Sequence, residues 1–478
     1  MICKKSINYK FTMAAAFLIV ETFGNSANIS ITAVKMSFDV HWTKFSLSPC
    51  LDAEYKKVYD IFSFLCWTSD ISVIVDGQKW DRMDCMKILL DNDKQQETAV
   101  PLIIKMASGL GEKGLVQDDM DALNHYLSSA EVSPWESKWI KALSAYANDN
   151  TYMFNSHLDD HLAEFNDDFF TAFIQLFQIL FVSGDSFAYK SFLSGLNVKG
   201  CYKILWDAFL GFIKIELGEM EDVEKLIRNA LDVAPSNGFV IHSYLHYLDY
   251  YGKVDEAISF MREIHPVLNK SVLQCHNTWH LAQFEVSKGD YSSAKMRYEC
   301  EIANSSASRG MMYDAVSLLV ALELEGYEVS SSDWGMLSER SNDFSHINTN
   351  IFTDSHVWIA CLKIGDPNMI TRCLQSVKDS AKTSYVYKHF GVKLFEALKA
   401  FVEKDFAAAS DDFFHLRGYI RYGYGGSLAQ RHMLWKFLFA SLSLSQREID
   451  KMRLRKVAHE IDLLFPHSKI FKKMLRNY

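Results

Sequence analysis

The sequence predicts an all-α fold, an α-α solenoid of tetratricopeptide-like helix pairs. Gly218 and Gly252 lie 34 residues apart, and each precedes a run with apolar residues at helical spacing. That period is typical of tetratricopeptide repeats, in which two antiparallel helices form one unit. The chain has 478 residues but only 7 Pro and no low-complexity linker, which favours one elongated repeat body over separate domains.

The register of these turns extends over most of the chain. The positions equivalent to Gly218 are spaced 34 to 39 residues apart, and they are Asp149, Gly184, Gly218, Gly252, Gly289, Gly326, Gly365 and Lys404. The pattern is tightest over residues 136–304. We therefore expect antiparallel helix pairs over nearly all of residues 52–474, with negligible strand, and Gly218 and Gly252 at turns or tight helix contacts.

Helix boundaries are predicted in order along the chain. Apolar residues at helical spacing indicate helices over residues 52–67, 84–91 and 98–108. Ser133 and Glu136 form a capping box that begins a helix running to Ala147. The final pair is expected from Ser427 to about Leu464, before Pro466.

Residues 1–35 do not follow the repeat pattern, so we assign residues 36–478 to a single helical repeat domain. Lys4, Lys5 and Lys10 precede a short apolar run, which has the outline of a secretory signal within residues 1–26. Nine Cys without a C-x-x-C pair indicate reduced thiols instead. We expect a cytoplasmic protein whose first 35 residues are an unstructured extension or precede the true start at Met36; secretion is the alternative.

The charge of the chain argues against nucleic-acid binding, and its hydropathy argues against a multi-span membrane protein. The formal charge of −9 repels phosphate backbones, so nucleic-acid binding is not expected. A mean hydropathy of −0.06 excludes a multi-span membrane protein. Residues 109–114 match the dinucleotide pattern G-x-G-x-x-G, but nothing downstream alternates strand with helix, so we interpret them as an inter-helix turn.

Two histidine pairs are the most informative polar residues. His242 and His246 are four residues apart, as are His276 and His280, so each pair shares one helix face. Both pairs fall on first helices, so all four side chains should converge within about 8 Å across adjacent packed helices. They could hold Zn or Fe, line a metal-free ligand pocket, or hydrogen-bond across the repeat interface beside Tyr244 and Trp279.

Two further groups of polar residues are candidates for ligand binding. Ser427 and Gln430 form a capping box after two glycines, and Arg431 adds a charge that could bind a carboxylate or phosphate. The alternative is a capped turn in which Arg431 pairs with an acidic neighbour. Asp354 and His356 are two residues apart and do not share a helix face, which argues against a catalytic dyad.

Four segments resemble the tetratricopeptide repeat protein 38 family. They are residues 241–246 (IHSYLH), 275–280 (CHNTWH), 352–356 (FTDSH) and 425–431 (GGSLAQR), with His41-Trp42 before them. The resemblance covers essentially everything after Met36. It implies an all-helical repeat protein, cytoplasmic, with an activity not settled for the family.

The resemblance has three departures. The extension before Met36 is unusual, Leu248 and Asp249 replace a third His and a Glu, and His432 replaces an Asp. The candidate ligand-binding residues are His242, His246, His276, His280, Asn277, Asp354, His356, Gln430 and Arg431. The four histidines are also the candidate metal ligands.

Two functions follow from these observations. The first is a binding scaffold whose concave groove holds a protein segment or small polar ligand, as extended repeat surfaces do. The alternative is a metal-dependent or small-molecule-processing enzyme that uses the histidine cluster with Arg431. The sequence has no G-x-S-x-G, P-loop or H-E-x-x-H motif, so no catalytic residues are assigned.

Overall fold

The fold was analysed in a computed structural model, which describes residues 53–68, 72–75, 78–90, 98–109, 117–129, 132–148, 150–180, 189, 192, 202–268, 273–303, 309–338 and 350–476. These residues form an all-α protein apart from one hairpin. The extension 1–35 and the register positions Asp149 and Gly184 lie outside them, as does most of the segment 109–114.

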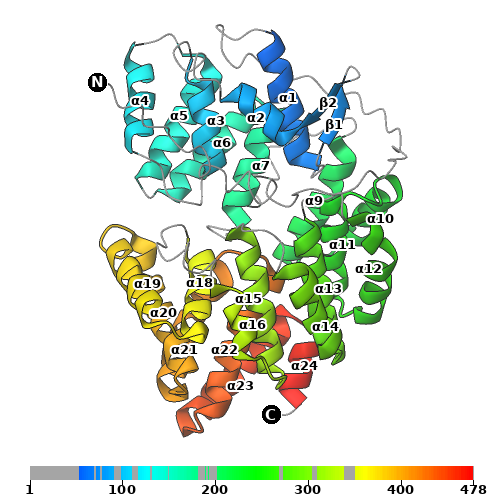
Figure 1. The fold of residues 1–478 in the computed structure, drawn as a ribbon, viewed down its shortest axis with the longest axis vertical. Helices are drawn as coiled ribbons and strands as arrows, with labels where there is room; N and C mark the ends of the chain where they lie inside the picture. Colours follow the sequence, from blue (N-terminus) through cyan, green and yellow to red (C-terminus); the bar gives the residue numbers. More distant parts are fainter. Residues whose placement is uncertain are drawn as a thin grey trace.

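The first part of the chain forms one end of the molecule (Figure 1). Its elements are α1 (Ala53–Thr68), β1 (Ser72–Val75), β2 (Gln78–Asp81), α2 (Arg82–Leu89), α3 (Val100–Gly109), α4 (Gln117–Ser129), α5 (Pro134–Ala147), α6 (Thr151–Glu164) and α7 (Phe169–Gln178). The helices predicted over 52–67, 84–91 and 98–108 correspond to α1, α2 and α3 within two residues. The capping box at Ser133 and Glu136 is present.

The hairpin is the one departure from a helical fold among the described residues. Strands β1 and β2 pair antiparallel, with Ser72 opposite Asp81 and Val75 opposite Gln78. The β-branched run from Val73 to Val75 favours an extended backbone, because branched side chains fit a pleated strand better than a helix. With two short strands, the hairpin does not change the fold class.

The rest of the chain continues as helices. They are α9 (Tyr202–Leu217), α10 (Val223–Val233), α11 (Gly238–Tyr250), α12 (Val254–Leu268), α13 (Gln274–Lys288), α14 (Tyr291–Arg297), the π-helix η4 (Tyr298–Ile302), α15 (Arg309–Leu324), α16 (Ser331–Gly335), α18 (Ile351–Ile364), α19 (Pro367–Ser380), the π-helix η5 (Tyr387–Gly391), α20 (Val392–Val402), α21 (Phe406–Tyr422), α22 (Leu428–Leu444), α23 (Glu448–Leu464) and α24 (Lys469–Arg476).

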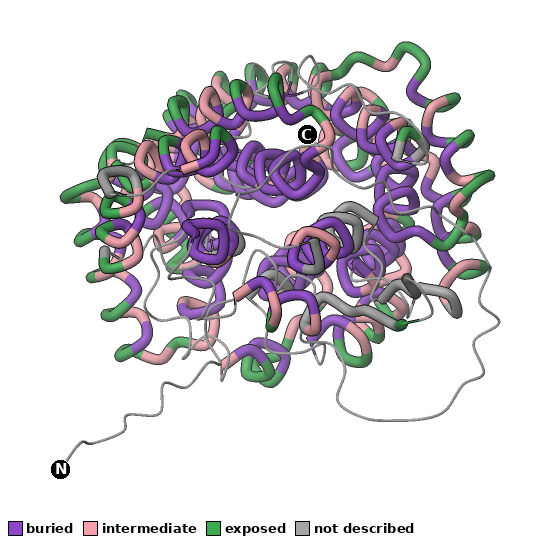
Figure 2. Tube along the Cα trace, turned by 90° about the horizontal axis from the view of Figure 1, so that it is seen from above, coloured by how far each residue is buried: buried purple, intermediate pink, exposed green. Residues whose placement is uncertain are grey.

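These helices form an inner and an outer layer. Helices α9, α11, α13, α15, α18 and α20 each contact the next member of this series, while α10, α12, α14, α19 and α21 pack on their outer side. The inner helix α11 is buried from Gly238 to Leu248, whereas α10 buries only Val223, Ile227 and Ala230. A helix that is apolar all round belongs inside and an amphipathic one outside. Exposed residues accordingly gather on the outer rim (Figure 2).

The turns that end the inner helices share one backbone conformation. Positive φ angles occur at Gly218 (72°), Gly252 (62°), Gly289 (87°), Gly326 (83°), Gly365 (79°) and Lys404 (64°). These are the six described positions of the predicted register. A left-handed residue after a helix allows the last carbonyls to be capped, as when Gly252 and Lys253 donate to Asp249 and Leu248. The repeating turn was therefore predicted correctly.

The C-terminal helices fold back onto the inner layer. The backbone N–H of Gly426 donates to the carbonyl of Leu180 over 2.7 Å, and α22 packs against α15. Lys473 of α24 forms an ion pair of 2.6 Å with Glu325 at the end of α15. In Figure 1 these helices, orange to red, lie against the green helices of the middle of the chain. The C-terminal helices thus cover part of the inner layer.

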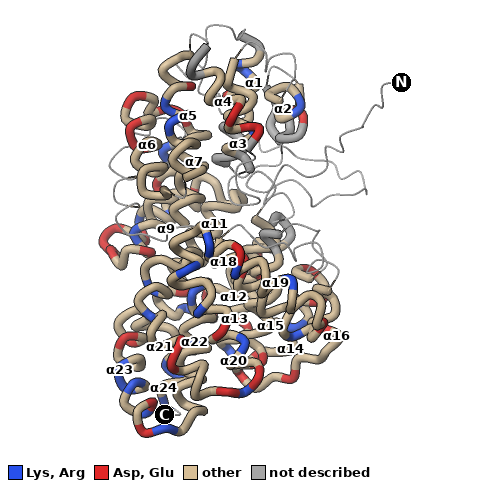
Figure 3. The backbone as a smooth tube through the Cα atoms, turned by 90° about the vertical axis from the view of Figure 1, so that its left-hand side faces the viewer, with Lys and Arg blue, Asp and Glu red and all other residues tan. Residues whose placement is uncertain are grey.

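Two properties of the surface bear on possible partners. None of the described helices is long and apolar enough to cross a membrane. Acidic and basic residues are interspersed over the described part of the chain (Figure 3). In the basic C-terminal part, Arg447 and Arg453 form ion pairs with Asp411 and Asp450.

Glycine substitutions test the turn geometry. At Gly218 an added Cβ meets no atom within 4 Å, so only the positive φ makes Ala unfavourable there, by roughly 1–2 kcal/mol. At Gly252 a Cβ would lie 2.2 Å from the carbonyl oxygen of His467. We expect Gly252→Ala to lower the free energy of unfolding by roughly 1–3 kcal/mol more than Gly218→Ala, because the turn between α23 and α24 must shift as well. Urea unfolding of both variants measures this, and equal losses would contradict the close contact.

Candidate functional site

Four histidines from two inner helices form the most unusual polar cluster in the described structure. Helix α11 begins at Asn237, whose side chain accepts the N–H groups of Phe239 and Val240, and it presents His242 and His246 one turn apart. Helix α13 presents His276 and His280 in the same way. Because α11 and α13 pack side by side, the two pairs face each other.

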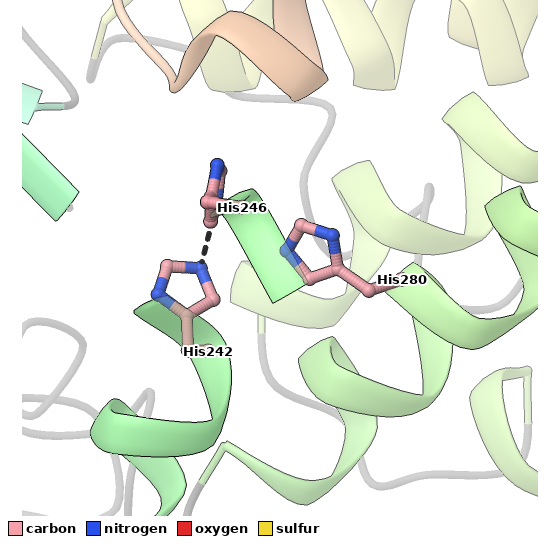
Figure 4. Close-up of side chains that lie close together, drawn as sticks. All are labelled: His242, His246 and His280. Carbon is pink, nitrogen blue, oxygen red and sulfur yellow. Dashed lines mark hydrogen bonds between the residues drawn. The ribbon is translucent and has the colours of Figure 1, made fainter. Parts of the chain in front are cut away.

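The predicted convergence of the four imidazoles is confirmed. The Nε2 atom of His242 lies 3.0 Å from Nε2 of His246 and 3.1 Å from Nε2 of His276. The ring of His280 is centred 4.7 Å from that of His246 and 4.9 Å from that of His276. His242, His246 and His280 can each direct one ring nitrogen so that the three lie within 4.8 Å (Figure 4).

A carboxylate fixes the orientation of one imidazole. Nδ1 of His276 lies 3.0 Å from both carboxylate oxygens of Asp314 on α15. Burial raises the pKa of Asp314, and His276 opposes that rise. An ionised carboxylate only accepts, so Nδ1 of His276 donates to Asp314, and Nε2 of His276 faces Nε2 of His242. This is the arrangement in which a carboxylate orients a metal-binding histidine.

The cluster has fewer protons than its nitrogens need. A neutral imidazole has one N–H group, so each of its ring nitrogens carries either a proton or a lone pair. Nε2 of His242 can therefore form one full hydrogen bond, to Nε2 of His246 or to Nε2 of His276, but not both. Nε2 of His280 is buried and has no hydrogen-bond partner in the described structure. Buried lone pairs without donors cost free energy, and a bound cation would satisfy them.

The surroundings seal the cluster from solvent. The exposed fractions of His242, His246, His276 and His280 are 9%, 2%, 7% and 2%. Phe212 contacts His242 and His246 through its ring, and Trp279 stacks on His276 at an interplanar angle of 11°. In this structure a peptide lying in a groove therefore has no access to these histidines.

Tyr244 does not belong to this seal, contrary to expectation. Its hydroxyl donates to Glu256 of α12 over 2.6 Å, and its ring packs on Phe260. Two residues from His242, it lies on the outer-layer side of α11, because residues two apart in a helix do not share a face. Trp279, in contrast, is where the sequence placed it.

A buried glutamate joins the cluster to α22. Glu216 of α9 accepts the backbone N–H of Leu428 over 2.9 and 3.1 Å, and its carboxylate lies 3.8 Å from Nδ1 of His246. Burial raises the pKa of Glu216 to about 7, and the positive charge of Arg431 opposes that rise. The first turn of α22 thus rests on the same carboxylate that lies behind His246.

Burial disfavours a positive charge on three of the four imidazoles. It lowers the pKa of His242, His246 and His280 well below the usual value, and the neighbouring imidazoles lower it further. A metal ligand must be the neutral imidazole, so this environment removes proton competition near pH 7. A buried imidazolium ion is disfavoured for the same reason.

Three other candidate residues lie outside the cluster and have partners of their own. Asn277 donates its amide to the carbonyl of Gly238 over 3.1 Å and ties α13 to the start of α11. Asp354 accepts a hydrogen bond from Tyr387, and Nδ1 of His356 donates to the carbonyl of Phe352 over 2.7 Å. Asp354 and His356 form no dyad, as their spacing predicted.

The predicted anion site at the start of α22 is filled by protein groups. Ser427 and Gln430 form the expected capping box. The guanidinium of Arg431 donates to the carbonyls of Gly425, Gly426 and Arg421 and is 4% exposed. The carboxylate at this helix start is that of Glu216, which accepts the backbone N–H of Leu428. Arg431 donates to carbonyls, and the described contacts include no ion pair between Arg431 and Glu216 of the kind expected for the capped-turn alternative.

Sequence reasoning missed the carboxylates around the cluster. Asp314 lies 38 residues after His276, and Glu216 lies 30 residues before His246, so neither belongs to a short motif. The register contained a signal, because both residues stand on inner helices next to those of the histidines. No family model matches this sequence.

The pH dependence of stability tests the burial of an imidazole remote from the cluster. Burial lowers the pKa of His356 to about 4, below the value near 6.5 of an unfolded chain. The folded state therefore binds fewer protons, and the stability linked to His356 is present above about pH 6.5 and lost as the pH falls. Groups with raised pKa, such as Glu216, act in the opposite direction, so a comparison with a variant is needed.

We expect wild type to lose about 1 kcal/mol more stability than His356→Gln when the pH falls from about 7 to about 5.5. Urea unfolding of both proteins with a chelator present measures the difference. Equal losses would show that His356 titrates alike in the folded and unfolded chain.

Proposed function

We propose that this chain is a helical-repeat protein that binds one divalent transition metal at His242, His246, His276 and His280. The observation that carries the proposal is the convergence of three buried Nε2 atoms at 3.0 and 3.1 Å with too few protons between them. The unpartnered Nε2 of His280 supports it. Asp314 and Glu216 would act behind the ligands.

The donor set favours Zn²⁺ or Fe²⁺. Neutral imidazole suits both ions, whereas Ca²⁺ and Mg²⁺ prefer oxygen ligands. Two nitrogens on one tetrahedral zinc lie about 3.4 Å apart, since each Zn–N bond is about 2.0–2.1 Å long. This value lies between two observed quantities. The Nε2 atoms in contact are 3.0 and 3.1 Å apart, and the ring nitrogens of His242, His246 and His280 lie within 4.8 Å of one another. Small side-chain movements would bring the ligands to bonding distance.

The repeat type and the family are part of the proposal. The six left-handed turns on the 34- to 39-residue register support tetratricopeptide-like pairs arranged as a solenoid. The resemblance of the histidine segments to the tetratricopeptide repeat protein 38 family agrees with that assignment. In the enzyme alternative, the metal would be the reactive centre. Arg431 would take no part in the reaction, because its guanidinium donates to backbone carbonyls.

Protein binding is a second candidate function. It would use the outer surface, because the chain's own helices cover part of the inner one. Leu444, Ile449 and Met452 are 50%, 45% and 62% exposed around the turn from α22 to α23, and they support this candidate. Apolar side chains grouped on a surface are typical of contact sites.

Cobalt binding tests the metal proposal. Co²⁺ replaces Zn²⁺ in nitrogen sites and absorbs visible light when it is tetrahedral. We expect chelator-treated protein to bind one Co²⁺ per chain with tetrahedral bands that Zn²⁺ abolishes. His280→Asn should weaken binding strongly, and Asp314→Asn should weaken it roughly 10- to 100-fold, as carboxylate partners of ligands do.

Two control variants make the result specific. His356→Gln changes a buried histidine outside the cluster, and Glu301→Gln breaks the pair of 2.7 Å between Glu301 and His265. Both should bind Co²⁺ as wild type does. Absence of stoichiometric binding in wild type, or equal weakening in the controls, would overturn the proposal.

A further inference from the structure

We infer that the metal takes a fifth, exchangeable ligand in addition to its four histidines, and that this ligand is a small anion of up to about three non-hydrogen atoms bound in cavities beneath α22. The inference rests on the proposed metal site and identifies the class of ligand that the site would take. It comes from three adjoining cavities next to His246 and His280, on the side where the cluster meets the C-terminal helices.

The three cavities share lining residues, and two of them are lined by a histidine of the cluster. His246 lines the first, of about 20 Å³, and His280 lines the second, also about 20 Å³. Asp249, Ala429, His432 and Ser468 line both. The third, of about 10 Å³, shares Ala429 and His432 with them and is also lined by Lys436.

The size of the cavities limits the ligand. A cavity needs about 10–15 Å³ to hold one water molecule, so the larger two have room for one or two waters each. A peptide or a nucleotide does not fit. A metal-bound water, or a linear or bent anion of two or three atoms, does.

The charges around the cavities favour an anion at the metal. Four neutral imidazoles leave the ion's two positive charges uncompensated by its direct ligands. Lys436 carries the only fixed positive charge among the described residues that line the three cavities, and it is 2% exposed. Asp249, the one acidic residue there, lines the two cavities next to the histidines, which Lys436 does not line; burial raises the pKa of Asp249 to about 7 and so weakens its negative charge at neutral pH.

His432 and Ala429 are the two residues common to all three cavities. Burial lowers the pKa of His432 to about 3. A neutral imidazole at this place can donate one hydrogen bond and accept another. It would therefore contact an anion or water bound at the exchangeable position without adding charge.

Azide binding to the Co²⁺-loaded full-length protein tests the inference. Azide has three atoms and one negative charge, and its coordination shifts the visible bands of Co²⁺. We expect a saturable shift with one azide per metal. Ala429→Val narrows all three cavities and should weaken azide binding about tenfold or more while Co²⁺ still binds.

Matched variants separate the cavity from general effects on α22. Ala440→Val adds the same methyl groups to α22 away from the cavities and should leave azide affinity unchanged. Lys436→Met keeps the side-chain length, removes the charge and should weaken azide, which also tests the inference should Ala429→Val fail to fold.

The outcomes distinguish the two proposals. Failure of wild type to bind Co²⁺ overturns the metal site and this inference with it. Binding of Co²⁺ without a spectral change up to high azide concentration leaves the metal site intact and overturns the exchangeable position. Wild-type azide affinity in both Ala429→Val and Lys436→Met places the anion elsewhere and rejects the cavities.

Discussion

The centre of this structure depends on one constraint: imidazole nitrogens with lone pairs are buried close together. Nε2 of His242 lies 3.0 and 3.1 Å from two other Nε2 atoms, and Asp314 fixes the proton of His276 away from them. In water such nitrogens would be hydrated at little cost. Buried between α9, α11, α13 and α22, they need either a shared proton or a cation, and burial disfavours the additional proton.

Closure of the chain over its own inner surface creates that burial. Glu216 accepts the first free N–H of α22, so a carboxylate beside the histidines also anchors the helix that covers them. An acidic group at a helix N-terminus is favourable because it meets unpaired N–H groups and the positive end of the helix dipole. Gly426 allows the close approach: a Cβ there would lie 2.4 Å from the ring of Phe352. The segment from Gly425 to Arg431 therefore allows α22 to pack onto the inner layer.

The sequence predicted the local features of the fold and the site well. The period near 34 located turns at Gly218, Gly252, Gly289, Gly326, Gly365 and Lys404, because a left-handed turn after a helix is a local property. The four-residue spacing predicted that the histidine pairs share a face, and equal rank in the register predicted that the pairs meet.

What the sequence did not predict depends on tertiary contacts. Three such contacts join residues that are 38 to more than 200 positions apart. They are the return of α22 onto the inner layer, the contact of Gly252 with His467 and the pairing of His276 with Asp314. Tyr244 was placed on the wrong side because the inner layer has two buried faces, so apolarity alone does not tell which face meets the cluster.

The most direct test of the account is a crystal structure of the zinc-loaded protein with diffraction data on both sides of the zinc absorption edge. The account predicts one strong anomalous peak among His242, His246, His276 and His280, with ring nitrogens about 2.0–2.1 Å from it. Zinc bound only at surface histidines such as His265, with the buried Nε2 atoms still in contact with each other, would contradict it.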